Sequence, residues 1–496
     1  MISGVKFRIY PSTFQKAKLS QWAGAQRFIW NAKVEEEKYL RTFARKYLPI
    51  GTYPEQDQTY SQYKSKEVCP WIYEIPSQVL RNSATRWYQT NKRFLRGECG
   101  RPRIKKKRDE MSLYLTRELF TLETHCDQIL LNIGTKTNNL GLIRWKSHRS
   151  FDIPASITIK RQAGCWTVSF SYGSEECSDL DYQNSCLSFL RDFKQEELKE
   201  MVVGIDRGIK VSFQVGGESL SPDLRSKNKH KAQCAYIRKH QRRLARQEKG
   251  SGRRNKTKSK IATINLHIAN RRLDFIHKAT YSLCRNQNYK AFIFEDLSIK
   301  KMSRAPRSKA RTDGKGFLPN GANAKAGLNR TILDQSWAKF ETVLLYKARK
   351  YGKVCFKISP EFTSQECADC AHIHPENRLS RDVFLCLNCG HRDHADRNAA
   401  MVLKKRAIKL ILDSGTELSD RGVLTPRLDS GRGAKVKTGK AKADQAIGKE
   451  ASKKRKKSGL DHTKSMTSSE TPSFLDVGSS PGDQPVIIEE FMVIRA

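Results

Sequence analysis

The stretch Met201-Val-Val-Gly-Ile-Asp206 decides the fold class of the C-terminal half of this chain. Its apolar run predicts a short buried strand that ends on a carboxylate. A second run, Ala291-Phe-Ile-Phe-Glu295, also ends on a carboxylate, and residues 353–358 predict a third strand. Apolar residues recur at helical spacing in between, which predicts two long helices over 227–285 and another from about 334 to 351. Strands that alternate with helices predict an α/β domain.

The region upstream of that domain has a different pattern. Over 112–172, apolar and polar residues alternate, and Ala163-Gly164 supplies a tight hairpin turn. Together with a first strand at Val5–Tyr10, these strands predict a small β-barrel. Two helices are predicted between the first strand and the others. Their apolar stripes are Leu19, Trp22, Ala25 and Ile29 in the first helix, and Leu80, Ala84, Trp87 and Phe94 in the second.

Three segments lack a regular pattern. Residues 174–198 are polar and acidic and predict a linker, and residues 303–325 predict a basic, glycine-containing loop. After about residue 412 the periodicity is lost, which predicts a mostly disordered tail with a Lys/Arg run at 453–457. That run could pass for a nuclear localisation signal, but we interpret it as an arm that binds DNA or RNA nonspecifically.

The chain carries a net charge of +42, from 93 Lys and Arg against 51 Asp and Glu. Such an excess attracts polyanions and predicts salt-sensitive binding to nucleic-acid phosphates. Solvated surface loops and a basic tail are the alternatives, but basic residues also crowd a Gly- and Pro-containing stretch at 100–108 and the helices near residue 240. The candidate nucleic-acid-binding residues are Arg101, Arg103, Lys105, Lys106, Arg238, Arg242, Arg243, Arg246, Arg253 and Arg254.

Three carboxylates are spaced as a two-metal nuclease would need them. Two Mg²⁺ ions about 3.5–4 Å apart can activate water and stabilise charge on phosphorus, and hard cations prefer oxygen ligands. An RNase H-like sheet delivers such ligands from a first strand, a central strand and a late helix. Asp206, Glu295 and Asp396 follow that order, and we predict that they are the catalytic magnesium ligands. A turn Asp or a helix N-cap is the alternative at two of these positions, and Asp296 and Asp393 are competing ligands.

Thirteen cysteines include two Cys-x-x-Cys pairs, Cys367 with Cys370 and Cys386 with Cys389. Pairs at this spacing favour a structural, tetrahedral zinc site over two disulfides, because four thiolates leave no open coordination position. The sequence shows no pattern typical of a signal peptide and no apolar run long enough to span a membrane. We therefore expect a reducing intracellular compartment and no membrane partner.

These residues resemble the TnpB family, the RNA-guided nucleases encoded by insertion sequences, and more distantly the miniature type V CRISPR effectors. The resemblance covers about residues 5 to 410. The motifs that carry it are Lys6-Phe-Arg-Ile-Tyr-Pro11, Gly100-Arg-Pro-Arg-Ile-Lys-Lys-Lys107, Gly204-Ile-Asp-Arg-Gly208, Glu295-Asp-Leu297, Thr363-Ser-Gln365 and Asp393-His-Ala-Asp-Arg-Asn-Ala-Ala400. The last motif joins the cysteine cluster to the third carboxylate and is the most specific of them.

The resemblance implies a multidomain α/β plus β-barrel architecture. A wedge-like β-barrel (1–10 and 110–175) would carry a helical recognition insert (11–109). A RuvC-like nuclease domain (199–360 and 391–411) would carry a zinc-ribbon insert (361–390) that binds the target nucleic acid, and 412–496 would be the tail. The resemblance also implies a guide RNA that pairs with target DNA. We expect a monomer rather than a dimer, in a prokaryotic cytoplasm and associated with the nucleoid.

Two other functions remain open from the sequence. One is a protein-only transposase or nuclease that acts on DNA ends or junctions without a guide. The other is a guided DNA-binding repressor that does not cut, although the presence of all three carboxylates argues against it. A small CRISPR effector is a further alternative to TnpB itself, because the chain is long for that family.

Overall fold

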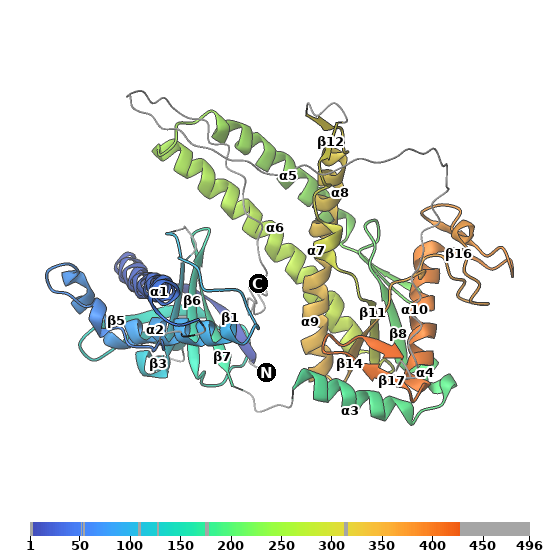
Figure 1. Ribbon diagram of the computed structural model, residues 1–496, viewed down its shortest axis with the longest axis horizontal. Coiled ribbons are helices and arrows are strands. Elements are labelled where there is room, and N and C mark those ends of the chain that lie inside the picture. Colours follow the sequence, from blue (N-terminus) through green and yellow to red (C-terminus); the bar gives the residue numbers. More distant parts are fainter. Residues whose placement is uncertain are drawn as a thin grey trace, which may run out of the picture. The chain divides into compact units, whose positions relative to one another are not determined.

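The computed structural model describes residues 3–50, 52, 55–107, 111–125, 128–173, 178–311 and 316–426 (Figure 1). The predicted tail lies outside the described residues from 427 onward. The parts before and after residue 174 are described separately. No helix among the described residues is long and apolar enough to cross a membrane.

The N-terminal part is built on a seven-stranded antiparallel sheet in the order β2-β6-β7-β1-β5-β4-β3. The strands are β1 (Ser3–Tyr10), β2 (Met111–Thr116), β3 (Phe120–His125), β4 (Gln128–Gly134), β5 (Asn139–Lys146), β6 (Ser156–Gln162) and β7 (Cys165–Tyr172). The predicted hairpin is confirmed: Gln162 pairs with Cys165 across a two-residue turn. Ala163 and Gly164 both have positive φ there, at 48° and 80°. No ladder joins β2 to β3 within the described strands, so closure into a barrel stays a prediction.

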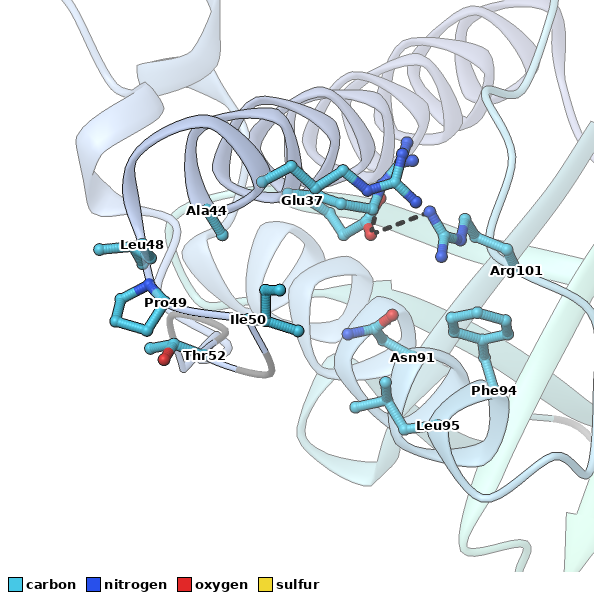
Figure 2. Close-up of a pocket in the computed structure, with 12 residues that line it drawn as sticks. Glu37, Ala44, Leu48, Pro49, Ile50, Thr52, Asn91, Phe94, Leu95 and Arg101 are labelled. Carbon is cyan, nitrogen blue, oxygen red and sulfur yellow. Dashed lines mark ion pairs between the residues drawn. The ribbon is translucent and has the colours of Figure 1, made fainter.

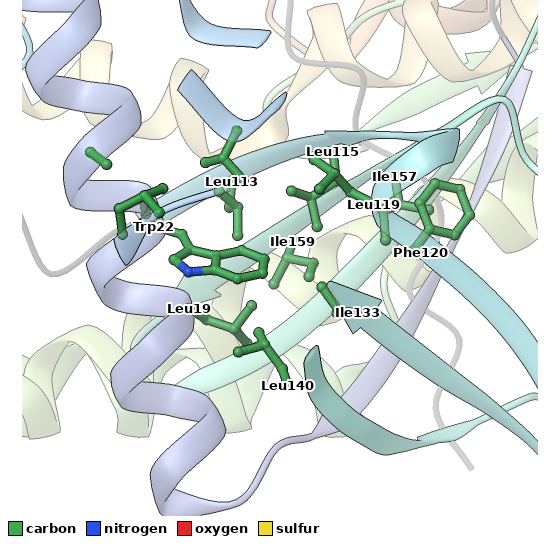
Figure 3. Packing of buried hydrophobic residues seen from close by; sticks show 14 of the residues in the cluster. Leu19, Trp22, Leu113, Leu115, Leu119, Phe120, Ile133, Leu140, Ile157 and Ile159 are labelled. Carbon is green, nitrogen blue, oxygen red and sulfur yellow. The ribbon is translucent and has the colours of Figure 1, made fainter. Parts of the chain in front are cut away.

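Two helices lie between β1 and β2, where the apolar stripes predicted them. These helices are α1 (Thr13–Tyr47) and α2 (Ser77–Leu95), and the short 3-10 turns of this part are η1 (Ser61–Tyr63), η2 (Pro70–Glu74) and η3 (Arg117–Leu119). Leu19, Trp22, Ala25 and Ile29 are all at most 2% exposed. Figure 3 shows Trp22 of α1 packed among Leu113 of β2 and Ile159 of β6. Each such large apolar side chain contributes about 1.5–3 kcal/mol on burial, so the stripe anchors α1 to one face of the sheet.

The C-terminal part is built on a five-stranded mixed sheet in the order β10-β9-β8-β11-β14. The strands are β8 (Val202–Asp206), β9 (Phe213–Val215), β10 (Glu218–Leu220), β11 (Ala291–Glu295) and β14 (Val354–Ile358). The last three strands of that order are parallel, and β9 and β10 form an antiparallel extension of β8. The three strands that were predicted from 201–206, 291–295 and 353–358 are thereby confirmed as neighbours.

Helices cover both faces of this sheet. They are α3 (Asp179–Arg191), α4 (Gln195–Met201), α5 (Leu224–Ala245), α6 (Gly252–Arg285), α7 (Ile299–Met302), α8 (Ala322–Gln335), α9 (Trp337–Lys350) and α10 (Ala395–Leu412). One apolar core joins Ile205 and Phe294 to Phe340 of α9, and another joins Ile293 to Leu403 of α10. Successive residues along each strand therefore face α9 and α10 in turn.

The remaining strands form short two-stranded ladders. They are β12 (Lys309–Ala310) with β13 (Phe317–Leu318), β15 (Val383–Leu385) with β16 (Arg392–His394), and β17 (Thr416–Leu418) with β18 (Leu424–Pro426). The cysteine-rich segment contains β15, β16 and the 3-10 turn η4 (Pro375–Asn377).

Three sequence-based predictions are wrong in detail. The predicted linker 174–198 contains α3 and α4, because Leu187, Leu190 and Leu198 are buried against the sheet. The helix predicted from about 334 to 351 is divided at Ser336, whose φ of 55° separates α8 from α9. Ordered structure continues past 412, because the β17–β18 hairpin contributes Leu424 to the core and Val423, just before β18, forms a single bridge with Lys357 of β14.

The loop prediction for 303–325 holds only partly. A two-residue ladder, β12 with β13, lies inside it, and α8 begins at Ala322. The short ladder has both strands exposed, so no apolar alternation could have marked it in the sequence.

Candidate metal centres

Two of the predicted catalytic carboxylates end neighbouring parallel strands. Asp206 is the last residue of β8 and Glu295 the last of β11. Ile293 of β11 pairs with Gly204 of β8, and side chains two positions further along each strand point to the same face of the sheet. Glu295 and Asp206 therefore both lie on the face that α10 covers. Asp396 lies in the first turn of α10. Three chain segments that are far apart in the sequence thus bring one carboxylate each to the same edge of the sheet.

The charges of these three side chains act on one another. The pKa of Asp206 is raised to about 7, first by burial and then by the negative charges of Glu295 and Asp396. The backbone N–H of Arg207, which donates to Asp206 Oδ1 at 2.8 Å, opposes the rise. Mutual repulsion between carboxylates is the electrostatic condition that a divalent cation relieves.

Gly204 explains how α10 approaches β8 so closely. A Cβ atom at this position would lie 2.1 Å from the carbonyl oxygen of Ala400, which no real contact allows. Glycine therefore lets the helix pack directly on the strand, and the approach sets the separation between Asp396 and Asp206. Gly204 begins the sequence motif 204–208, but only the structure shows that it contacts α10.

Other side chains hold the second and third carboxylates. The buried Thr363 hydroxyl donates to Glu295 Oε1 at 2.5 Å. His394 precedes α10 as its N-cap, and its Nδ1 accepts from the backbone N–H of Asp396 at 3.3 Å. A negative side chain in the first helical turn is also favoured by the helix dipole.

The competing carboxylates lie elsewhere. Asp296 has the opposite strand parity to Glu295 and pairs with Arg421 at 3.2 Å. Asp393 belongs to β16, where its Oδ1 accepts from the backbone N–H of His394 at 2.7 Å, and it pairs with Arg397 at 3.7 Å. The opposite parity of Asp296 and the position of Asp393 on β16 rather than on α10 favour Glu295 and Asp396 as the ligands.

Sequence reasoning missed one cation at this centre. Arg378, from the segment between the two cysteine pairs, lies 3.8 Å from Asp396 Oδ1 and lowers the pKa of Asp206. The side chain is about one-third exposed, at 31%. No local motif marks this arginine, because it meets the carboxylates only through the tertiary fold.

The four predicted zinc ligands form a tight cluster. Their Sγ atoms all lie within 4.8 Å of one another, with Cys367 to Cys389 at 3.6 Å and Cys370 to Cys386 at 3.5 Å. Tetrahedral zinc with Zn–S bonds of about 2.3 Å would separate sulfurs by about 3.8 Å, whereas a disulfide needs about 2.05 Å. The cluster therefore suggests zinc. Among the described residues these four cysteines form the one cluster of at least three Cys, His, Asp or Glu side chains that could hold a metal ion.

The two knuckles have the same backbone pattern. In the first, the N–H of Cys367 donates to His372 O and the N–H of Ala371 to Cys367 O, both at 3.0 Å. In the second, the N–H of Cys386 donates to His391 O, and Gly390 closes the turn with a φ of 72°. The repeated turns aim amide groups around the sulfurs, as thiolate ligands require.

The ribbon is attached to the helix that carries Asp396. Asn398 of α10 is fully buried, and its amide accepts from Ala368 N at 2.9 Å and donates to Glu366 O at 2.8 Å. Arg406, two turns further along α10, forms an ion pair with Glu366. The first knuckle and the third carboxylate therefore belong to one connected unit.

The basic stretch 101–107 is held on α1 by hydrogen bonds to its backbone. Trp30 Nε1 donates to Arg103 O at 2.9 Å, and Asn31 pairs with both backbone groups of Lys105 at 2.8 and 3.0 Å. The Lys105 ammonium lies over the Trp30 ring. Arg101 is 38% exposed and pairs with the buried Glu37 at 3.5 Å (Figure 2).

Figure 2 shows Arg101 above Phe94, beside a hollow of about 420 Å³ between the ends of α1 and α2. Because backbone bonds fix this stretch, its exposed cations, Arg103 and Lys106 among them, are displayed in a defined array.

The other predicted basic residues lie on α5 and α6, which run side by side (Figure 1), except Arg246, which is the C-cap of α5. Between residues 224 and 260 the sequence has fifteen Lys and Arg and a single Glu. The side chains of Arg238, Arg242, Arg243, Arg246 and Arg253 are exposed. Arg254 differs, because its guanidinium donates to Leu244 O and to Gln247 O and so caps the end of α5. We therefore leave Arg254 out of the proposed phosphate contacts.

Comparison with known proteins gives matches to three family models. A probable transposase family of IS605 OrfB proteins matches residues 181–305, and a helix-turn-helix domain of OrfB proteins matches 1–40. In this chain the latter range forms β1 and most of α1. The target-nucleic-acid-binding (TNB) domain of Cas12f1-like proteins matches 337–403, a range that includes all four cysteines and Asp396.

Two curated relatives align over most of the chain. The putative RNA-guided DNA endonuclease InsQ of Escherichia coli K12 is 28% identical over 400 residues, which is 80% of this chain and 90% of that protein. A putative RNA-guided DNA endonuclease of Streptomyces pristinaespiralis is 26% identical over 401 residues, or 80% and 87% of the two chains.

Shorter and more distant similarities also occur. Cas12f1 of Sulfoacidibacillus thermotolerans is 38% identical over 68 residues, covering 13% of this chain and 16% of that one. A solved Cas12f1–sgRNA–target DNA complex covers 82% of this chain and 98% of its own, with 13% identity and a TM-score of 0.47. The matched family models and the long alignment with InsQ show that this chain is similar to the OrfB proteins of IS605-type elements, the group that the sequence motifs resemble.

Proposed function

We propose that this protein is an RNA-guided, Mg²⁺-dependent DNA endonuclease with a RuvC-type, RNase H-like active site. The observation that carries the proposal is the convergence of Asp206, Glu295 and Asp396 at one edge of the mixed sheet, with mutual charge effects on the pKa of Asp206. The two long relatives are named RNA-guided DNA endonucleases, which supports the guide RNA and target DNA as partners.

The three carboxylates would hold two Mg²⁺ ions, which supply a nucleophilic water and neutralise charge on the phosphodiester in the transition state. The carboxylate oxygens themselves provide hard ligands from separate elements. Asp206 must give up its proton before it can bind a cation, because its pKa is near 7. Arg378, 3.8 Å from Asp396, is placed to contact a phosphate oxygen at the same centre.

The zinc site has a structural role in this proposal. Cys367, Cys370, Cys386 and Cys389 would bind one Zn²⁺ as four thiolates, with no position left for water. The ion would fix the ribbon, and the ribbon would in turn fix the N-terminus of α10 through Asn398.

The remaining parts would bind nucleic acid. We propose the division into a wedge-like barrel (1–10 and 110–175), a helical recognition insert (11–109), a RuvC-like domain (199–360 and 391–411), a zinc-ribbon insert (361–390) and a tail (412–496). Arg101, Arg103, Lys105 and Lys106, with the exposed arginines of α5 and α6, would contact phosphates. We also propose a monomer that acts in a prokaryotic cytoplasm in association with the nucleoid.

The test is to purify the full chain, sequence any RNA that comes with it, and assay Mg²⁺-dependent cutting of a matched plasmid. We expect one defined RNA species and cutting that Asp206→Ala abolishes. Asp296→Asn is the matched control, because that carboxylate lies on the opposite face and should leave cutting intact. Cutting without any RNA would favour a protein-only nuclease, and guided binding without cutting would favour a repressor.

A further inference from the structure

Arg207 follows Asp206 directly, and its side chain lies under the candidate centre. The guanidinium is only 1% exposed, a rare state for an arginine. Its strand parity is opposite to that of Asp206, so it faces α9 and not the carboxylates. Nη1 donates to Glu341 Oε2 of α9 at 3.0 Å, Nη2 donates to the main-chain oxygen of Glu295, and the group lies over the Phe294 ring.

The ladder between β8 and β11 stops one residue short of the carboxylates. Its last pair is Ile205 with Phe294, so Asp206 and Glu295 have no ladder pair with each other. Arg207 supplies the missing link, since its guanidinium bonds the carbonyl of Glu295 across the gap. This side chain therefore bridges the ends of the two strands.

Glu341 fixes the guanidinium from the other side. Its second oxygen, Oε1, pairs with Lys357 of β14 at 2.6 Å, and the Glu341 side chain is 16% exposed. One chain of charges, Lys357–Glu341–Arg207, thus joins the ends of β14, β11 and β8 to α9. Breaking a buried charge network at one partner is costly, which keeps the arrangement rigid.

We propose that Arg207, held by Glu341, is a positioning residue that sets the spacing of Asp206 and Glu295 for divalent metal binding. The inference rests on the proposed function. The guanidinium of Arg207 bonds to Glu341 and to the main-chain oxygen of Glu295, and the ion pair that it forms is with Glu341. Its effect is therefore one of geometry. Two carboxylates that repel each other bind a cation less tightly when nothing holds them at a fixed spacing. Loss of the side chains that support metal ligands has this effect.

The test measures metal binding directly. Mn²⁺ serves as the probe, and its binding to the purified full chain is followed by electron paramagnetic resonance, beside the Mg²⁺ dependence of cutting. Arg207→Lys keeps the charge but cannot reach both Glu341 and the Glu295 carbonyl. We expect Arg207→Lys and Glu341→Gln each to weaken Mn²⁺ binding and to raise the Mg²⁺ requirement by about 10- to 100-fold. Guide and target binding should stay unchanged.

Arg349→Lys is the matched control, because that arginine is 11% exposed and pairs with Asp179 in the same part of the fold. It should leave Mn²⁺ binding at the wild-type value. Unchanged Mn²⁺ affinity in a folded Arg207→Lys or Glu341→Gln variant would overturn the inference, and Glu341→Gln serves if the arginine variants do not fold. If wild-type Mn²⁺ binding is itself insensitive to Asp206→Asn, the proposed function fails instead.

Discussion

Asp206→Asn should make the metal-free protein more stable while it abolishes cutting. The pKa of Asp206 is raised from 3.8 to about 7 by burial and by Glu295 and Asp396. A carboxyl that is harder to ionise in the folded state than in the unfolded state destabilises the fold when the pH is above both values. Asparagine has nearly the same shape and can still accept from the Arg207 N–H, but it has no charge.

The size of the effect follows from the two pKa values. At about 1.4 kcal/mol for each unit of pKa, the cost of ionising Asp206 in the fold at pH 8 is about 4 kcal/mol. Asp206 keeps some exposed surface, so solvent screening makes this an upper bound. Between pH 3.8 and 7 the unfolded state binds fewer protons than the folded one, so wild-type stability falls as the pH rises. The advantage of the variant should be about 1.6 kcal/mol at pH 5 and largest above pH 7.

The assay is urea unfolding of wild type and variant in chelator at pH 5 and pH 8. Added Mg²⁺ should stabilise the wild type at pH 8 and stabilise the variant much less, because bound cation offsets the repulsion. Asp296→Asn, whose parent carboxylate pairs with Arg421, should be no more stable than the wild type at either pH and should keep the wild-type response to Mg²⁺. Equal stabilities of wild type and Asp206→Asn at pH 8, or a difference that does not change with pH, would refute the electrostatic account.

Three further predictions concern other parts of the molecule. Cys386→Ser should reduce zinc content, measured by atomic absorption, from about one ion per chain to near zero, and normal content would contradict the four-thiolate site. Gly204→Ala should cost more than about 3 kcal/mol in unfolding free energy, because the new Cβ meets Ala400 O, whereas Gly217→Ala meets no atom within 4 Å and should cost under about 1 kcal/mol. Arg242→Ala with Arg243→Ala should lower the log–log salt slope of nucleic-acid binding by about 1.8, and an unchanged slope would exclude these two side chains from phosphate contact.

Strong local patterns explain why much of the fold could be predicted. The runs that end at Asp206 and Glu295 are apolar throughout, since both faces of the mixed sheet are covered, and the stripe through Trp22 matches a helix with one buried face. Where the pattern was weak, prediction failed. The segment 174–198 has only a few buried leucines among acidic residues, so α3 and α4 are stabilised by tertiary packing and not by their own periodicity.

In the candidate site, too, local patterns could be predicted and long-range contacts could not. Its candidate ligands could be chosen from the sequence because two of them end recognisable strands and the third begins a helix, and strand parity separates Glu295 from Asp296. The side chains that hold the ligands could not be found, because their contacts are long-range. Thr363 reaches Glu295 across 68 positions of sequence, and Arg207 reaches Glu341 across 134.

The motif that follows Cys389 contains both a candidate metal ligand, Asp396, and a residue that holds the zinc ribbon, Asn398. Asp396 and Asn398 lie two residues apart in the first turns of α10, so the helix presents them in different directions. Asp396 points to the carboxylate cluster, while Asn398 binds the backbone of the first knuckle through both ends of its amide. Any shift of the ribbon relative to α10 would therefore move Asp396 as well. Zinc loss should therefore weaken metal binding at the carboxylates, because Asn398 ties the ribbon to the helix that carries Asp396.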